Sequence, residues 1–117
     1  MANNETFIQN TMLPAISHGN VRVFRNNVGA LKTETGQLVR FGLEKSSSDL
    51  IGFRSIKITP DMVGKTIAQF VSIEIKTEKG KPTDGQKRWL DMILKFGGIA
   101  GIARSIDEAK ELLKGEL

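Results

Sequence analysis

Two short apolar segments carry the residues whose types and spacing suit metal-assisted chemistry. Asp49 stands at the head of one segment, and Glu74 and Lys76 lie two residues apart at the end of a longer one. Residues two apart share a face of a strand, so Glu74 and Lys76 are expected side by side. If the two strands are neighbours, Asp49 and Glu74 converge on one divalent cation, which polarises a phosphoryl oxygen and lowers the pKa of a bound water. Lys76 then orients that water or stabilises charge on the phosphate.

Each of these assignments has a simpler alternative. Glu74 and Lys76 could form a surface ion pair at a strand end, since a Glu-x-Lys tripeptide is common by chance. Gln86 lies near the start of a predicted helix and could reach the same site, or it could only complete the capping box that Thr83 opens. Glu5, the only acidic residue of the first predicted helix, could add a carboxylate or could only interact with the helix dipole.

Basic residues gather around these positions and favour a polyanionic partner. The chain has 17 basic and 13 acidic residues and a net charge of +4, a bias that permits nucleic acid without requiring it. The triplet Arg25-Asn26-Asn27 follows a predicted strand, and such side chains make directional contacts to phosphates or bases. The other candidates for nucleic-acid contact surround the loop after Lys76; they are Lys79, Lys81 and Lys87.

Composition restricts the metal and the cofactor. The 117 residues include no cysteine and a single histidine, His18, so a metal must be held mainly by oxygen, which favours hard cations. The triplet Gly64-Lys65-Thr66 lacks the first glycine of a phosphate-binding loop, and the glycines at 97–101 lack dinucleotide-binding spacing, so no nucleotide cofactor is expected. No segment is long and apolar enough for a membrane span. Residues 1–5 do not resemble a signal peptide, so a cytoplasmic location is expected.

The elements that must position these residues follow from periodicity, from turn signals and from capping boxes opened by Thr83 and Ser105. The length predicts one domain over residues 1–117. Helices are expected over 4–17, 83–96 and 105–114, and strands over 21–24, 49–53, 67–77 and 99–103. Residues 38–41 could form a short strand or an extended loop. The strand over 67–77 is nearly continuously apolar, as in a central strand covered on both faces. The last two strands flank a helix and are therefore expected to be parallel. The prediction is an α/β or α+β fold with a central mixed β-sheet flanked by helices.

The ordered set of Ser48-Asp49, Glu74-Ile75-Lys76 and Gln86 resembles the PD-(D/E)XK nuclease superfamily. Within it, nearly the whole chain is similar to a stand-alone VRR-NUC domain of phage or bacterial type, although Ser48 replaces the proline before the aspartate. The resemblance implies a restriction-endonuclease-like fold and Mg²⁺- or Mn²⁺-dependent DNA cleavage. It also implies that Asp49, Glu74 and the Ile75 carbonyl bind metal, that Lys76 is catalytic, and that Gln86 and Glu5 match further site residues.

Stand-alone relatives resemble Holliday-junction resolvases, so the resemblance implies a homodimer acting on branched DNA, in a bacterial host's cytoplasm if the protein is phage-encoded. Two matched cuts across a four-way junction suit a twofold dimer with two sites. Two alternatives remain open at this stage. One is a non-catalytic nucleic-acid-binding module that keeps the nuclease fold, and the other is a small interaction protein with a fortuitous motif.

Overall fold

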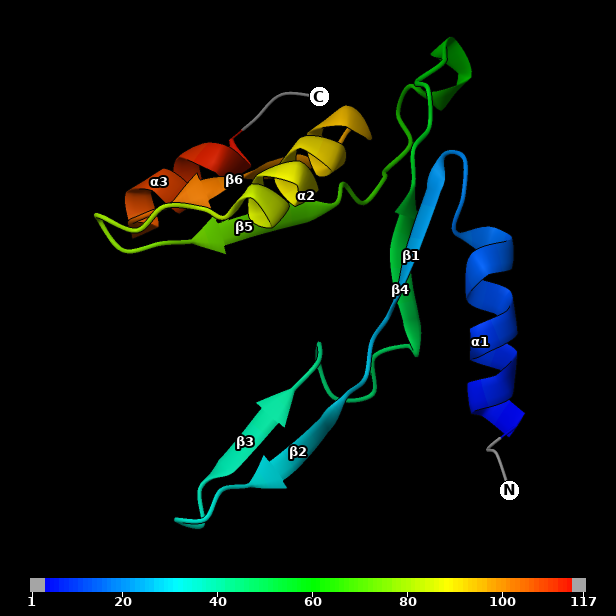
Figure 1. The fold of residues 1–117 in the computed structure, drawn as a ribbon. Helices are drawn as coiled ribbons and strands as arrows, with labels where there is room; N and C mark the ends of the chain where they lie inside the picture. Colours follow the sequence, from blue (N-terminus) through cyan, green and yellow to red (C-terminus); the bar gives the residue numbers. More distant parts are fainter. Residues whose placement is uncertain (1–3, 115–117) are drawn as a thin grey trace. The chain divides into compact units, whose positions relative to one another are not determined.

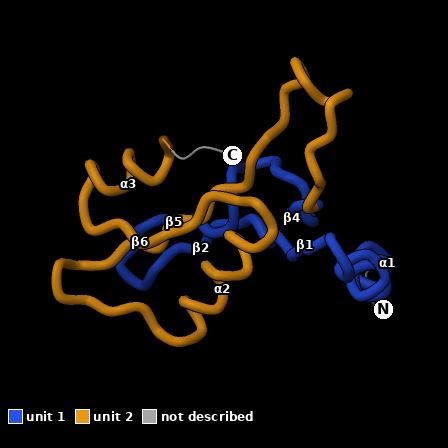
Figure 2. The backbone as a smooth tube through the Cα atoms, turned by 90° about the horizontal axis from the view of Figure 1, so that it is seen from above, with its two compact units in different colours: residues 1–54 blue, residues 55–117 orange. Residues whose placement is uncertain are grey.

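The computed structural model describes residues 4–114, which form three α-helices, one short 3₁₀-helix and six strands (Figure 1). The chain divides into two compact units, residues 1–54 and 55–117 (Figure 2), and each is described here by itself. The predicted α+β class is confirmed. Where one central mixed sheet was expected, the strands pair as three two-stranded sheets, β1-β4, β2-β3 and β5-β6.

The first unit begins with α1 (Asn4–Ile16), in agreement with the predicted helix. Pro14 lies inside its last turns, and no residue of α1 is buried. The helix stops before Gly19, whose φ of 63° lies in the left-handed region that glycine adopts without a steric penalty. Ser17 then ties the turn to the following strand, because its hydroxyl accepts a hydrogen bond from the Val23 amide at 3.0 Å.

The strand β1 (Val21–Arg25) pairs antiparallel with β4 (Leu50–Arg54), with Arg25 opposite Leu50. Both were predicted within one residue. The ladder continues one step past the strand ends, because the Asn26 amide donates to the Asp49 carbonyl at 2.8 Å. Asp49 is therefore held at the entry to β4 by its backbone.

Between these strands the prediction missed one element. The segment read as a polar connection contains β2 (Gly29–Lys32), which forms a hairpin with β3 (Leu38–Phe41). A four-residue strand with only partial burial has little alternating pattern to detect. The turn is closed by Gly36 at φ 84° and by the Thr33 amide donating to the Gln37 carbonyl.

The second unit opens with a 3₁₀-helix, η1 (Pro60–Met62), and is built on the parallel pair β5 (Val71–Ile75) and β6 (Ile99–Ala103). The parallel pairing is confirmed. The strand predicted over 67–77 is shorter, because a strand extends only as far as its hydrogen-bonded partner and β6 has five residues. The prediction that both faces of this strand are covered was also wrong, because Ile75 is 79% exposed.

Helices α2 (Asp84–Lys95) and α3 (Ile106–Leu113) contact opposite faces of this pair, with the strands between them in Figure 2. At position 101 of β6, glycine leaves room for α3. A Cβ there would lie 2.6 Å from a Leu112 methyl carbon. The core of the described residues is small; its buried apolar members are Leu90, Ile93, Ala100 and Ala103.

Both capping predictions hold at the helix starts. Thr83 caps α2 and Ser105 caps α3, each accepting a hydrogen bond from the third helical amide at 3.1 Å. The reciprocal bond differs at α3. There the Glu108 carboxylate accepts from the Arg104 amide rather than from the amide of Ser105.

Candidate active site

One face of β5 carries Glu74, as the sequence predicted, together with Ser72. Ser72 accepts a hydrogen bond from the Trp89 indole at 2.8 Å, and Glu74 accepts one from Gln86 at 2.9 Å. Both donors lie on α2, so this face is the one that α2 covers. The expected alternation of β5 is confirmed at these positions, and it places a carboxylate at the edge of the helix–strand contact.

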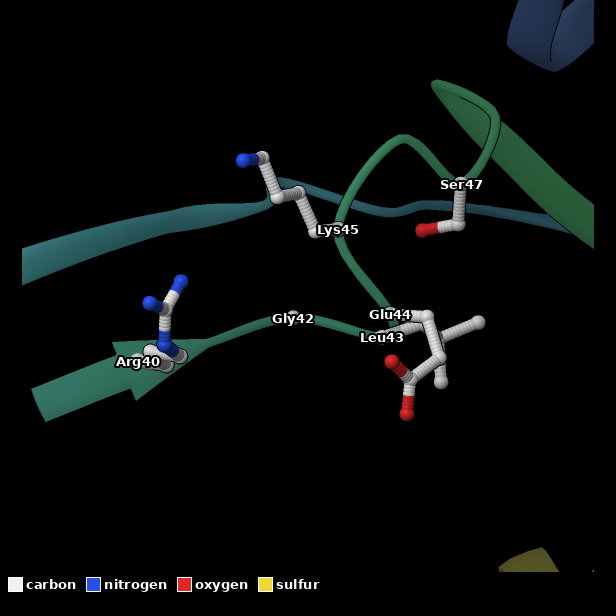
Figure 3. A pocket seen from close by; sticks show the side chains of 6 residues that line it. All are labelled: Arg40, Gly42, Leu43, Glu44, Lys45 and Ser47. Atoms are coloured by element: carbon white, nitrogen blue, oxygen red, sulfur yellow. The ribbon is translucent and has the colours of Figure 1, made fainter.

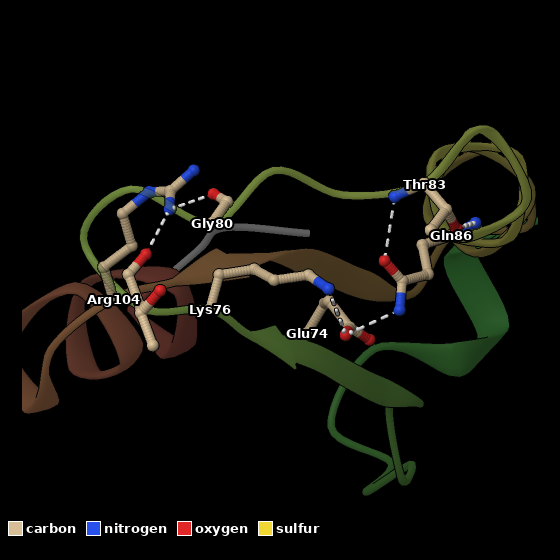
Figure 4. Close-up of polar contacts among 7 residues, drawn as sticks. Glu74, Lys76, Gly80, Thr83, Gln86 and Arg104 are labelled. Carbon is tan, nitrogen blue, oxygen red and sulfur yellow. Dashed lines mark hydrogen bonds and ion pairs between the residues drawn. The ribbon is translucent and has the colours of Figure 1, made fainter.

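The Glu74 carboxylate is held between a cation and an amide (Figure 4). Its Oε1 atom accepts from Gln86 Nε2 and lies 3.6 Å from Lys76 Nζ. The Glu74 and Lys76 side chains are 32% and 21% exposed, respectively. A pair with this much contact with water adds little to stability, typically about 0–1 kcal/mol.

Gln86 performs both of the roles that the sequence left as alternatives. Its Oε1 accepts from the Thr83 backbone amide at 2.9 Å, which completes the capping box of α2, while its Nε2 donates to Glu74. A side-chain amide can do this because it carries an acceptor and two donors. One residue thus couples the start of α2 to the orientation of the Glu74 carboxylate (Figure 4).

Sequence reasoning did not single out Arg104, which closes the loop between β5 and α2. Its NH1 group donates to the carbonyls of Thr77 and Gly80, at 2.6 Å each (Figure 4). This loop joins the strand of Glu74 and Lys76 to the helix of Gln86. The sequence did offer one signal for Arg104, which is its position directly after a predicted parallel strand. Parallel neighbours end at the same edge of a sheet, so a residue there lies beside the loop that follows the other strand.

The end of β5 carries oxygen atoms of the kind that bind divalent cations. The Phe70 carbonyl and the Lys76 amide form hydrogen bonds with β6. Backbone groups of successive strand residues point to alternate edges, so the Ile75 carbonyl points to the edge of β5 away from β6. Glu74 and Ile75 thus offer a carboxylate and a carbonyl oxygen one residue apart, the donor set that hard cations prefer. Residues 4–114 contain no group of three or more carboxylate or histidine side chains placed to hold a metal.

The other predicted site residues lie in the first unit. Asp49 is exposed at the entry to β4, and Glu5 lies in the first turn of α1. Glu74 belongs to the second unit, so the convergence of either carboxylate with it stays a prediction.

The predicted nucleic-acid contacts divide by exposure. Arg25, Lys79, Lys81 and Lys87 are exposed. Asn26 differs from them, because it is only 9% exposed and its side chain is bonded within the first unit. Near Asn26, a hollow after β3 is flanked by the basic side chains of Arg40 and Lys45 (Figure 3); Gly42, Leu43, Glu44 and Ser47 also line it.

The α+β fold and the Glu74–Lys76–Gln86 arrangement define a candidate nuclease. In a comparison with known protein families, the model of the VRR-NUC domain matches residues 17–107. The chain belongs to the VRR-NUC domain family. It is thus a member of a nuclease domain family, and nucleic acid is its substrate class. The match spans the boundary between the two units at residues 54 and 55.

Other comparisons add no further relative. No curated protein matches the chain, and no solved structure matches it. None of the helices within residues 4–114 is long and apolar enough to span a membrane.

Proposed function

We propose that this protein is a metal-dependent, structure-specific endodeoxyribonuclease that hydrolyses phosphodiester bonds of branched DNA. The observation that carries the proposal is the Glu74 carboxylate, oriented by Gln86 and placed 3.6 Å from the Lys76 ammonium group in a nuclease-family chain. A module that only binds nucleic acid would gain little from carboxylates placed near phosphates, because like charges repel.

Glu74, the Ile75 carbonyl and Asp49 are the residues that would hold the metal. When bound, Mg²⁺ or Mn²⁺ offsets the negative charge of the phosphate during water attack. Glu74 presents its carboxylate in a fixed direction because Gln86 Nε2 occupies one side of Oε1. Glu5 is a further candidate carboxylate from the first unit.

The Lys76 ammonium group carries a positive charge and three hydrogen-bond donors, and it has no acceptor. Its ammonium group can donate hydrogen bonds to the attacking water or to a phosphate oxygen, where negative charge grows as the new P–O bond forms. At 21% exposure the charge is partly shielded from water, which strengthens its effect on a bound phosphate.

The exposed cations Arg25, Lys79, Lys81 and Lys87 are proposed to contact DNA phosphates. Each neutralised phosphate makes binding more sensitive to salt. We also propose a homodimer, because two sites related by a twofold axis suit paired cuts in a four-way junction.

The proposal is tested by incubating the purified protein with four-way-junction, flap, splayed and linear DNA of matched sequence, in Mg²⁺, Mn²⁺ or EDTA. We expect the junction to be cut fastest, with either metal, and no cutting in EDTA. Light scattering at the working concentration should give the mass of two chains. Salt-sensitive binding with no cutting in either metal would instead identify a non-catalytic binding module.

The two roles of Gln86 can be separated with Gln86→Met and Thr83→Ala. Both variants weaken the cap of α2, and loss of an N-cap costs about 1 kcal/mol. Only Gln86→Met removes the donor to Glu74, so it alone is expected to lower cleavage, by about 10–100-fold as for other groups that orient a metal ligand. Urea unfolding and initial cleavage rates make the comparison. An equal loss of cleavage in both variants would reduce Gln86 to a helix cap.

A further inference from the structure

Asn26 is the buried polar side chain of the described chain, at 9% exposure. It directly follows β1, where the sequence suggested a contact to nucleic acid. A buried amide makes hydrogen bonds within the protein, because an unpaired polar group away from water is costly. The partners of Asn26 therefore indicate what it does.

All of these partners lie in the segment that leads to Asp49. The Asn26 side-chain oxygen accepts from the Leu43 amide at 3.0 Å, and its Nδ2 donates to the Ser48 carbonyl at 2.9 Å and to the Ser47 hydroxyl at 2.6 Å. Its backbone amide donates to the Asp49 carbonyl at 2.8 Å. Asn26 thus binds both ends of the segment 43–49.

One residue of this segment and the glycine directly before it have positive φ angles. Gly42 has φ 83° and Ser46 has φ 70°, and for serine the left-handed region is disfavoured by its Cβ. A Cβ at Gly42 would lie 2.8 Å from the Val28 Cα, so the segment also packs closely on the chain after Asn26. The side-chain amide of Asn26 therefore contacts Ser47 and Ser48, the two residues directly before Asp49, while its backbone N–H contacts Asp49 itself.

We propose that Asn26 is a positioning residue for the Asp49 carboxylate: it fixes the segment 43–49 so that Asp49 enters β4 in one orientation. This inference rests on the proposed function, in which Asp49 binds the metal. It replaces the contact to DNA suggested by the sequence, because the Asn26 amide is occupied by protein partners.

The variants Asn26→Ala and Asn26→Asp test the proposal, with Asn27→Ala as the matched control at an exposed neighbouring asparagine. Asn26→Asp keeps the acceptor for Leu43 and loses the Nδ2 donor, so it serves if Asn26→Ala fails to fold. Mn²⁺ binding to the DNA-free protein is measured by electron paramagnetic resonance. The Mn²⁺ concentration for half-maximal cleavage and the KM for junction DNA are measured alongside, on protein shown to be folded by circular dichroism.

The folded Asn26 variants are expected to bind Mn²⁺ about 10–100-fold more weakly, with the KM for DNA unchanged and cleavage recovered at high Mn²⁺. Asn27→Ala should match the unsubstituted protein. Unchanged Mn²⁺ affinity with a raised KM would overturn the proposal and return Asn26 to a DNA contact. If the unsubstituted protein neither binds Mn²⁺ nor cuts DNA, the proposed function fails and the positioning role fails with it.

Discussion

Replacing Glu74 by glutamine is expected to lower the cleavage rate by about 1,000-fold or more, because a lost metal ligand removes several kcal/mol of transition-state stabilisation. The glutamine keeps an oxygen that can accept from Gln86 Nε2, so the contact between β5 and α2 is retained. The variant should also lose Mn²⁺ binding in the absence of DNA. Initial rates on junction DNA and electron paramagnetic resonance measure the two effects.

Glu78→Gln is the matched control, because it makes the same chemical change at an exposed residue four positions further on. It should leave both measurements unaltered. Cleavage by Glu74→Gln within tenfold of the unsubstituted protein would remove Glu74 from the metal site and would leave the carboxylate as one half of an ion pair.

Replacing Lys76 by methionine is expected to lower the cleavage rate by about 100–1,000-fold, the typical loss when one group that stabilises transition-state charge is removed. Unlike Glu74→Gln, this variant should not weaken Mn²⁺ binding. A positive charge 3.6 Å from Glu74 Oε1 opposes a cation on that carboxylate, so its removal should preserve or tighten Mn²⁺ binding. Single-turnover rates and Mn²⁺ titrations separate the two effects.

Lys110→Met provides the control for Lys76, since it removes an exposed lysine of α3, which contacts the opposite face of the β5-β6 pair. Urea unfolding should show a change of less than about 1 kcal/mol for Lys76→Met, as expected for a partly exposed pair. Lys76 would be a DNA-binding residue instead if the variant raised only the KM for DNA and left the single-turnover rate unchanged.

Local signals predicted the elements that carry the candidate site. The capping residues Thr83 and Ser105 located the starts of α2 and α3, and the apolar run before Gly80 located β5. Such signals act over three or four residues, so they can be read without knowledge of the fold. The shared face of Glu74 and Lys76 followed from the alternation of a strand in the same way.

The errors lie where a partner decides the structure. The β2-β3 hairpin lacks a strong pattern of its own and depends on pairing between its strands. β5 ends where β6 ends, so its length was set by another strand rather than by its apolar run. Ile75 belongs to that run and is nevertheless 79% exposed.

The amino-acid sequence by itself determined the fold class, the family and the identity of the candidate residues, because these depend on residue type and short spacing. Only the tertiary structure decided how Gln86 divides its amide between Thr83 and Glu74, and it alone identified the hydrogen-bond partners of Asn26 and Arg104. Asn26 bonds to Ser47 across 21 residues and Arg104 to Thr77 across 27. Hydrogen bonds over such separations form when folding brings distant segments together, so short-range patterns do not specify their partners.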